Sequence, residues 1–315
     1  MDVFNLFIDK DIIERIVESA NISIAKHKER SGEQESACNA PTCGPEIQCF
    51  LGLNLFRGLY NETDILTDDV WYGAHARPYY RSCMDQRRYN FLLARISVQD
   101  HKNMLKEYKS DMFWRARWFL NKFESNARAY YEHSEMVVLD ETLRNYFGRG
   151  CDFTVFLQDK PGQMGILYFT LGDCKSRYFS RIIPKSKPGT GMPVPWKMDD
   201  VVMEMASDIT GQGRIFITDR GYSSIPVNEK LFQQRTLHVG TIRTDRKGLL
   251  TDAKTKQPLH TTKFYWKTDS PTMCIAYQAK KPKKVLLVSS AHELLMMGKR
   301  KIQKRFTSTI KCAAV

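Results

Sequence analysis

The sequence predicts an α+β protein in which a helical N-terminal region precedes a mixed-sheet core of the α/β kind and a small β-rich insertion. Up to about residue 133, apolar residues recur at the spacings of three and four that mark one face of a helix. From residue 134, short runs of β-branched and aromatic residues bounded by Gly and Pro replace that spacing. The 315 residues, 42% of them hydrophobic, can bury a sizeable core and suggest about two domains.

The charge balance favours a partner that carries phosphates. The chain has 48 basic and 35 acidic residues, which gives a net charge of +13. Composition alone does not distinguish DNA, RNA and a membrane surface. No apolar run approaches the roughly 18 to 20 residues of a membrane helix, and the N-terminus lacks the basic start and apolar core of a secretion signal. We therefore expect no membrane segment and a location in the cytosol or nucleus.

The cysteines do not indicate a metal module. They are Cys38, Cys43, Cys49, Cys83, Cys151, Cys174, Cys274 and Cys312. Their spacing is irregular, and it contains neither a CxxC pair nor a matching pair of histidines. We expect reduced thiols in the core and loops, and we predict no zinc site.

Two helices are expected in the first 60 residues. Asp9 can cap a helix whose apolar residues between Ile12 and Ala20 form one buried face. Residues 26–45 are polar and contain Ser31-Gly32, so they are predicted to form a loop. Ile47 to Leu59 is apolar on most sides, which is typical of a central helix packed by others.

Two further helices are predicted to begin at Asp85 and Asp111. Four arginines crowd the first of them, namely Arg81, Arg87, Arg88 and Arg95. These side chains could grip phosphates, but a solvated face is the interpretation we favour. The Trp and Phe residues after Asp111 have a helical spacing, which core packing explains better than base stacking.

The core is predicted to run in the order β-β-β-α-β-α-β. The strands are centred on Met136 to Leu139, Ile166 to Leu171, Tyr178 to Ile183, Ile215 to Thr218 and Leu237 to Ile242. One helix is expected after Pro195, with Met198, Val201, Val202 and Met205 on one face, and another begins at Ser223 or Ser224 before Pro226. Lys185 to Pro193, rich in Lys, Pro and Gly, is expected to be a loop.

Two of these strands end in an aspartate, Asp140 and Asp219. If the strands are neighbours in one sheet, the two carboxylates come together, and paired carboxylates are natural ligands of Mg²⁺. With this strand order, the arrangement is the plan of a ribonuclease-H-like nuclease core, which holds two divalent ions about 3.5 to 4 Å apart for phosphodiester chemistry. The alternative for each aspartate is a cap or turn. Asp173 follows Gly172 at a turn and is expected to be structural, with a place near the site as the alternative.

The last part of the chain is predicted to form short strands and a basic tail. The strands are Thr261 to Lys267, Thr272 to Gln278 and Val285 to Ser289. Between the last two lie Lys280, Lys281, Lys283 and Lys284. This cluster could bind phosphate, resemble a nuclear-import signal or simply be a soluble turn.

Several groups of residues, in a fixed order, resemble the piggyBac transposase family and its domesticated derivatives over most of the chain. The groups are Leu139-Asp140-Glu141 with Phe147-Gly148-Arg149 and Lys160-Pro161 before Gly165; Asp173; Thr218-Asp219-Arg220 with Tyr222 and Ser224-Ile225-Pro226; Val239-Gly240-Thr241-Ile242-Arg243; and Leu286-Leu287-Val288-Ser289-Ser290. Each group is modest alone, but their order is specific. Gly221, where an aromatic residue is usual, and one extra residue between Gly148 and Lys160 depart from the pattern.

The resemblance implies a DNA transposase. In the family, three aspartates bind the metal ions that cut and join DNA ends at a TTAA target. Asp140 matches the first and Asp219 the second, whereas no Asp follows Ser290 to match the third, and the family's zinc-binding C-terminal module is also unmatched. We therefore expect Mg²⁺ or Mn²⁺ if the site is occupied, and either a catalytically inactive DNA-binding protein or a truncated gene model of an active element.

The resemblance also assigns roles to the parts of the chain. Residues 1–133 correspond to a dimerisation and DNA-binding region, 134–243 to the ribonuclease-H-like core, 244–290 to a β-rich insertion and 291–315 to a divergent basic tail. The expected partners are double-stranded DNA and a second copy of the chain in a homodimer, and the expected location is the nucleus. The DNA-binding candidates are Arg149, Lys160, Arg220, Arg243, Lys280, Lys281, Lys283 and Lys284. A non-enzymatic adaptor of the same fold is the alternative, and the core alone also fits an RNA-processing nuclease.

Overall fold

The chain divides into two compact units. The computed structural model describes residues 3–98, 111, 113–146, 148, 154–158, 160, 162–185, 197–266, 270–281 and 283–292. The first unit is Met1–Asn126 and the second is Ala127–Val315. The division falls in the last turn of helix α7, a little before the predicted domain border at residue 133.

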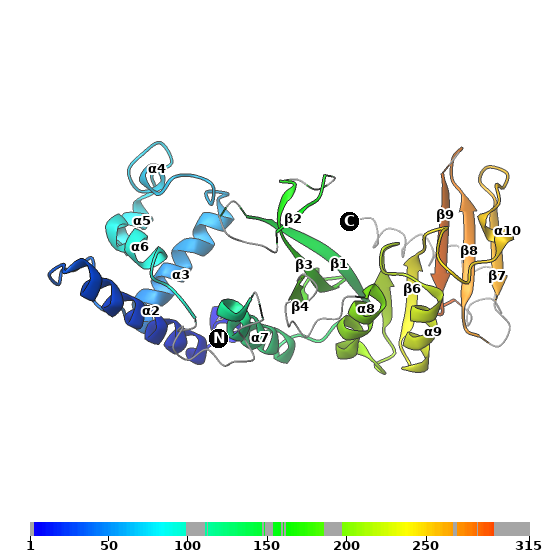
Figure 1. Cartoon of the computed structure of the whole chain (residues 1–315), viewed down its shortest axis with the longest axis horizontal. Coiled ribbons are helices and arrows are strands. Elements are labelled where there is room, and N and C mark those ends of the chain that lie inside the picture. The colour runs from blue at the N-terminus through cyan, green and yellow to red at the C-terminus, as the bar shows by residue number, and fades with distance from the viewer. Residues whose placement is uncertain are drawn as a thin grey trace. The chain divides into compact units, whose positions relative to one another are not determined.

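The described part of the first unit is helical (Figure 1). Its helices are α1 (Val3–Phe7), α2 (Lys10–Ser31), α3 (Gly44–Leu59), α4 (Thr67–Trp71), α5 (Pro78–Cys83), α6 (Gln86–Leu93) and most of α7 (Trp114–Ala129). As predicted, the Asp9 side chain caps α2 by accepting from the Ile12 amide, and Asp85 caps α6. The central α3 buries Phe50 and Leu53 in a cluster with Trp71.

Two expectations for this unit were wrong. The loop predicted from residue 26 begins later, because α2 continues to Ser31 and ends where Gly32 adopts a left-handed φ of 66°. Arg88 lies on neither a solvated nor a phosphate-binding face, because it is buried and its Nε and Nη2 each lie 2.7 Å from a Glu46 carboxylate oxygen. The partner is 42 positions away, so helical spacing could not reveal it.

The second unit is built on a nine-stranded sheet in the described part of the chain. The strands are β1 (Met136–Asn145), β2 (Val155–Phe156), β3 (Met164–Asp173), β4 (Phe179–Pro184), β5 (Ile215–Thr218), β6 (Leu237–Thr241), β7 (Thr262–Trp266), β8 (Met273–Gln278) and β9 (Lys284–Ser289). The helices are α8 (Met198–Ala206), α9 (Ile225–Gln233) and α10 (Thr251–Lys254), with a 3₁₀ turn at Ser207–Ile209. The loop predicted at Lys185 to Pro193 falls, after Lys185, outside the described residues.

The middle of the sheet has the predicted ribonuclease-H-like plan. β1 pairs with β3 in antiparallel and with β5 in parallel orientation, and β5 pairs in parallel with β6. β4 lies on the outer edge of β3. The order β4-β3-β1-β5-β6, with α8 leading into β5 and α9 leading into β6, follows the pattern inferred from the sequence.

The strands of the β-rich insertion continue this sheet instead of forming a separate layer. β9 pairs antiparallel with β6, and β8 and β7 follow it outward. Periodicity had identified the three strands, but it carries no information on which strand lies beside them.

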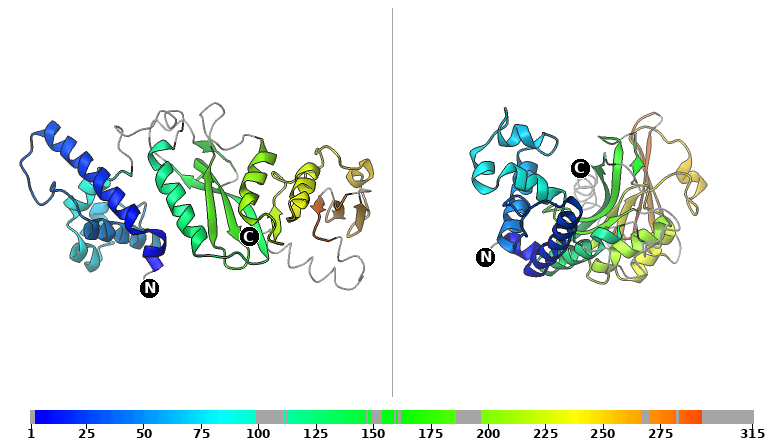
Figure 2. Two further views of the ribbon diagram at one scale, coloured as in Figure 1. Left: turned by 90° about the horizontal axis from the view of Figure 1, so that it is seen from below. Right: turned by 60° about the vertical axis from the view of Figure 1, so that its left-hand side comes forward.

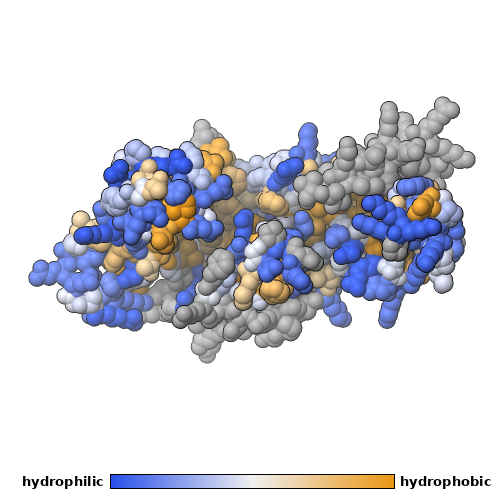
Figure 3. All heavy atoms as spheres, turned by 90° about the horizontal axis from the view of Figure 1, so that it is seen from above, coloured by the Kyte–Doolittle hydropathy of each residue, from blue (hydrophilic) through white to orange (hydrophobic). Residues whose placement is uncertain are grey.

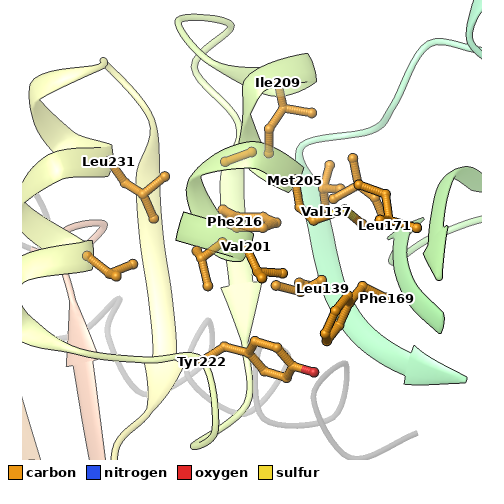
Figure 4. Close-up of a cluster of buried hydrophobic side chains, with 14 residues drawn as sticks. Val137, Leu139, Phe169, Leu171, Val201, Met205, Ile209, Phe216, Tyr222 and Leu231 are labelled. Carbon is orange, nitrogen blue, oxygen red and sulfur yellow. The ribbon is translucent and has the colours of Figure 1, made fainter. Parts of the chain in front are cut away.

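Helices α8 and α9 lie on one face of the sheet (Figure 2). Val137 and Leu139 of β1 point to this face, where they pack with Val201 and Met205 of α8 and with Phe216 of β5 (Figure 4). Side chains alternate between the two faces of a strand. Asp140, one position after Leu139, therefore projects from the opposite face.

Candidate functional site

The strand register places Asp140 and Asp219 side by side. β1 and β5 are parallel, and Leu139 pairs with Thr218, so the next position on each chain is an aspartate. Residues at the same height on adjacent strands share a face of the sheet. Both aspartates are exposed. The carboxyl ends of two neighbouring parallel strands thus present a pair of carboxylates, as expected from the sequence.

Hydrogen bonds orient each aspartate through its Oδ1 atom. Asp219 Oδ1 accepts from the Thr241 hydroxyl at 3.0 Å and from the Arg220 amide. Asp140 Oδ1 accepts from the Glu141 amide at 2.7 Å. Thr241 lies in the sequence motif but was not predicted as a site residue, because its contact depends on the register between β5 and β6.

A buried polar network supports the backbone beneath Asp219. The Thr218 hydroxyl lies 2.7 Å from Ser223 Oγ and 2.8 Å from His238 Nε2. The other ring nitrogen, His238 Nδ1, lies 3.0 Å from the Asn228 amide oxygen and therefore donates to it. Burial lowers the pKa of His238 to about 3, so the ring is neutral near pH 7.

Glycine is required at position 240, next to this network. A Cβ on Gly240 would lie 2.6 Å from Thr218 Oγ1 and 2.9 Å from the Thr218 carbonyl oxygen. Contacts that short do not occur between a real Cβ and backbone atoms. The Gly in the Val239-Gly240-Thr241 motif is therefore explained by the hydroxyl groups packed under Asp219.

A third carboxylate, Glu141, belongs to the other face of the sheet. The Tyr222 hydroxyl donates to Glu141 Oε1, and the Tyr222 ring packs edge-on against Phe169. Burial and the neighbouring Glu141 carboxylate raise the pKa of Tyr222 well above its ordinary value, so the hydroxyl remains a donor. Figure 4 shows Tyr222 beside Leu139 and Phe169 in the core. Glu141 thus has a structural partner.

The donor set fits the binding of a divalent ion in part. Mg²⁺ in proteins is commonly held by one or two carboxylates together with water and phosphate oxygens, and Asp140 and Asp219 supply such a pair. No group of three or more His, Cys, Asp or Glu side chains suited to a metal ion occurs among the residues that the structure describes. The pair therefore fits one ion better than two.

Asp173 is structural, as the sequence indicated. It is buried and accepts hydrogen bonds from the amides of Ser134, Lys175 and Ser176. These bonds hold the pKa of the Asp173 carboxyl far below its usual range, although burial opposes them. Asp173 pairs with Val137, whereas Asp140 pairs with Thr170, so Asp173 lies at the other end of β1.

The predicted DNA-binding residues are spread over the second unit. Lys160 Nζ donates to the Glu141 carbonyl at 3.3 Å, and Arg220 is exposed next to Asp219. Arg243 is exposed and paired with Asp245 at 2.8 Å. Arg149 lies outside the described residues. The structure thus brings Lys160 and Arg220 close to the residues that carry the carboxylates.

The lysine cluster lies on strands at the other side of the sheet from β1, away from the carboxylate pair. Lys280, Lys281 and Lys283 are exposed at the turn between β8 and β9, and Lys284 begins β9. The face of this end of the sheet seen in Figure 3 is largely hydrophilic.

Sequence reasoning missed one cation near the carboxylates, Arg246, whose Nη2 donates to the Gly221 carbonyl at 2.6 Å.

Comparisons with known proteins agree with this geometry. A family model described as transposase IS4 matches residues 1–314. A solved structure of the piggyBac transposase synaptic complex with hairpin DNA matches with a TM-score of 0.82 and 25% sequence identity. The match covers 92% of this chain and 60% of that one, so the chain spans less than two thirds of that protein. The resemblance inferred from the motifs and the ribonuclease-H-like fold are confirmed.

In the described segments, no helix combines the length and the apolar character needed to cross a bilayer.

Proposed function

This chain belongs to the transposase IS4 family, and on that premise we propose that it binds double-stranded DNA and holds a divalent ion between Asp140 and Asp219. The observation that carries the proposal is the register of β1 and β5, which sets the two exposed aspartates side by side. The matching solved structure is a complex with hairpin DNA, and the net charge of +13 favours a polyanion.

We propose Mg²⁺ or Mn²⁺ as the ion. Members of this transposase class generally use a divalent metal, and two carboxylates with a DNA phosphate make a suitable oxygen donor set. When bound, such an ion polarises a phosphodiester and neutralises charge that develops on its oxygens. The chain's own contribution is to orient the aspartates through Thr241 and two main-chain amides. Arg220 and Lys160, which lie close to the residues that carry the carboxylates, are the proposed phosphate contacts.

We further propose that residues 1–315 bind DNA without cutting it. Cutting and joining by two ions needs the third aspartate of the family, and no Asp follows Ser290 in this sequence. With two carboxylates, one ion lacks ligands, and in-line attack loses part of its charge stabilisation. The Tyr222 contact of Glu141 supports this, because it engages the carboxylate of the residue next to Asp140 in a hydrogen bond within the protein.

The test is a binding and cleavage assay on one duplex that contains TTAA. We expect the affinity, measured by fluorescence anisotropy, to fall steeply with salt, by about 10³ to 10⁵ between 50 and 200 mM if 6 to 10 phosphates are contacted. Mg²⁺ or Mn²⁺ should strengthen binding in the wild type but not in Asp140→Ala or Asp219→Ala. Absence of binding at low salt would refute the DNA-binding proposal. Robust nicking that Asp140→Ala abolishes would refute the inactive assignment.

The adaptor alternative makes a different prediction in the same assay. If the fold serves only as a DNA-binding scaffold, chelation with EDTA leaves the affinity unchanged and Asp140→Ala binds like the wild type. For either function we propose a nuclear location, because duplex DNA is the partner and Lys280, Lys281 and Lys283 are exposed. A homodimer is also proposed from the family, and light scattering of the purified chain would test it.

A further inference from the structure

β1 and β3 extend well beyond the carboxylate pair, and an exposed apolar pair lies where β2 joins β3. β1 continues for five residues after Asp140, to Asn145, and pairs with β3 along this length. The short β2 is attached to the outer side of β3 at the far end (Figure 1). There Phe156 and Met164 face each other across the strands, with 66% and 51% of their surfaces exposed.

The register puts this apolar pair on the face that carries Asp140. Asp140 pairs with Thr170 of β3, and residues directly opposite each other in an antiparallel pair share a face. Counting in twos along β3 from Thr170 reaches Met164, which pairs with Phe156. At about 3.3 Å per residue, the six positions between Thr170 and Met164 span about 20 Å along the strand. This length corresponds to about six base-pair rises of duplex DNA.

Hydrogen bonds hold the described residues of the turn that leads into Met164. Gly162 and Gln163 both adopt left-handed φ values, 80° and 51°. The Leu157 amide donates to the Gln163 carbonyl at 2.7 Å, and the Gln163 amide donates to the Lys160 carbonyl at 3.1 Å. These bonds fix the approach of β2 to β3, so the two apolar side chains are presented in a defined position.

The part of β1 and β3 that extends beyond Asp140 also carries positive charge. Arg144 is exposed on the face of Asp140, four positions further along β1, and Lys160 is in the turn. Two side chains are far too small an apolar area for a protein interface, which needs about 800 Å² from each partner. Among the residues that the structure describes at this end of the sheet, an apolar pair flanked by cations instead suits DNA, because many DNA-bending proteins insert apolar side chains such as Phe or Met between two base steps.

We propose that Phe156, assisted by Met164, is a wedge that unstacks one base step of duplex DNA lying along the Asp140 face. The proposal deepens the DNA-binding function and rests on it. Arg144 and Lys160 hold the phosphates that flank the step, while Asp140 and Asp219 meet the backbone about six base pairs away. The wedge thus deforms the DNA at a point that the carboxylates do not reach.

The experiment uses a set of duplexes, each with a single 2-aminopurine, whose fluorescence rises when it is unstacked. Binding of the full chain is followed by anisotropy and unstacking by fluorescence in the same sample. We expect the wild type to unstack 2-aminopurine at one position or a narrow cluster of positions. Phe156→Ala should remove this rise while weakening binding by no more than about tenfold, since phosphate contacts supply most of the affinity. Met164→Ala should reduce the rise in part.

The matched control is Phe232→Ala. Phe232 is 39% exposed on α9, which covers the face opposite to Asp140, so this variant should bind and unstack like the wild type. Phe156→Leu should retain part of the rise, and circular dichroism confirms that each variant is folded. Binding without unstacking, or unstacking that persists in both Phe156→Ala and Met164→Ala, overturns the wedge and leaves DNA binding intact. A wild-type chain that does not bind duplex DNA at low salt overturns both proposals.

Discussion

His238 is a buried histidine whose neutral ring holds the end of β5 through Thr218. Its pKa of about 3 in the folded chain lies below the ordinary value of 6.5. Above pH 6.5 neither the folded nor the unfolded state protonates the ring. Between pH 6.5 and 3 only the unfolded state binds the proton, so this group lowers the free energy of unfolding by about 1.4 kcal/mol for each pH unit of acidification.

Replacing the His238 ring tests this dependence of stability on pH. His238→Leu leaves the Asn228 amide oxygen without its donor, so we expect a loss of about 1–3 kcal/mol at pH 7. The same variant should lose stability less steeply than the wild type between pH 6 and 4.5, by about 1.4 kcal/mol per unit. Urea unfolding at several pH values measures both quantities. His75→Leu, at an exposed histidine, is the control. Equal pH slopes in wild type and variant would contradict the assignment.

Tyr222 offers a second residue-scale prediction. Tyr222→Phe keeps the ring against Phe169 but removes the donor to Glu141. We expect a loss of about 0.5–1.5 kcal/mol in the free energy of unfolding, because one hydrogen bond to a half-buried carboxylate is lost and water can replace part of it. Tyr130→Phe, at an exposed tyrosine, should change it by less than about 0.5 kcal/mol. A Tyr222→Phe chain as stable as the wild type would show that the contact contributes nothing.

The sequence could locate the aspartates but not what orients them. Each of Asp140 and Asp219 follows an apolar strand, so the strand pattern pointed to both, and the structure places them on adjacent strands. Their role as metal ligands remains a prediction. Thr241 and Tyr222 reach their partners through the register of β6 and the turn before α9, and no local pattern encodes those contacts.

At the scale of elements, β6 is constrained by the hydroxyl groups of its neighbours. Gly240→Ala would push a methyl group against Thr218 backbone and side-chain atoms. We expect a loss of about 1–3 kcal/mol or more and a weaker response of DNA binding to Mg²⁺, because the end of β5 that carries Asp219 must move. Gly221→Ala is the matched control, since nothing lies within 4 Å of a Cβ there. Equal stability of the two variants would contradict this packing.

Elements with a clear apolar pattern or a cap were predictable, whereas elements without one, and the pairing between distant strands, were not. β1, β5, α8 and α9 follow from strand runs, helical spacing and caps at positions such as Ser224. α4, α5 and β2 contain five, six and two residues, too few to show a period. The junction of β9 with β6 depends on pairing between distant segments, which one sequence does not display.

At the scale of the whole molecule, each compact unit has a hydrophobic core of its own. The first contains Leu53 and Trp71, and the second contains Leu139 and Phe216. Units with separate cores can unfold separately, in which case a single melting temperature does not describe the chain. Two calorimetric transitions are therefore expected.

Two core substitutions, one in each unit, show which calorimetric transition belongs to which unit. Leu53→Ala, at a residue that is 2% exposed, should cost about 2–5 kcal/mol and lower the transition of the first unit alone. Phe216→Ala, at a fully buried residue, should cost about 3–5 kcal/mol and lower only the other transition. The salt-dependent DNA affinity of Leu53→Ala, measured below its first transition, should match that of the wild type if the second unit supplies the phosphate contacts. One transition that both substitutions shift equally would instead show that the units unfold as a single cooperative structure.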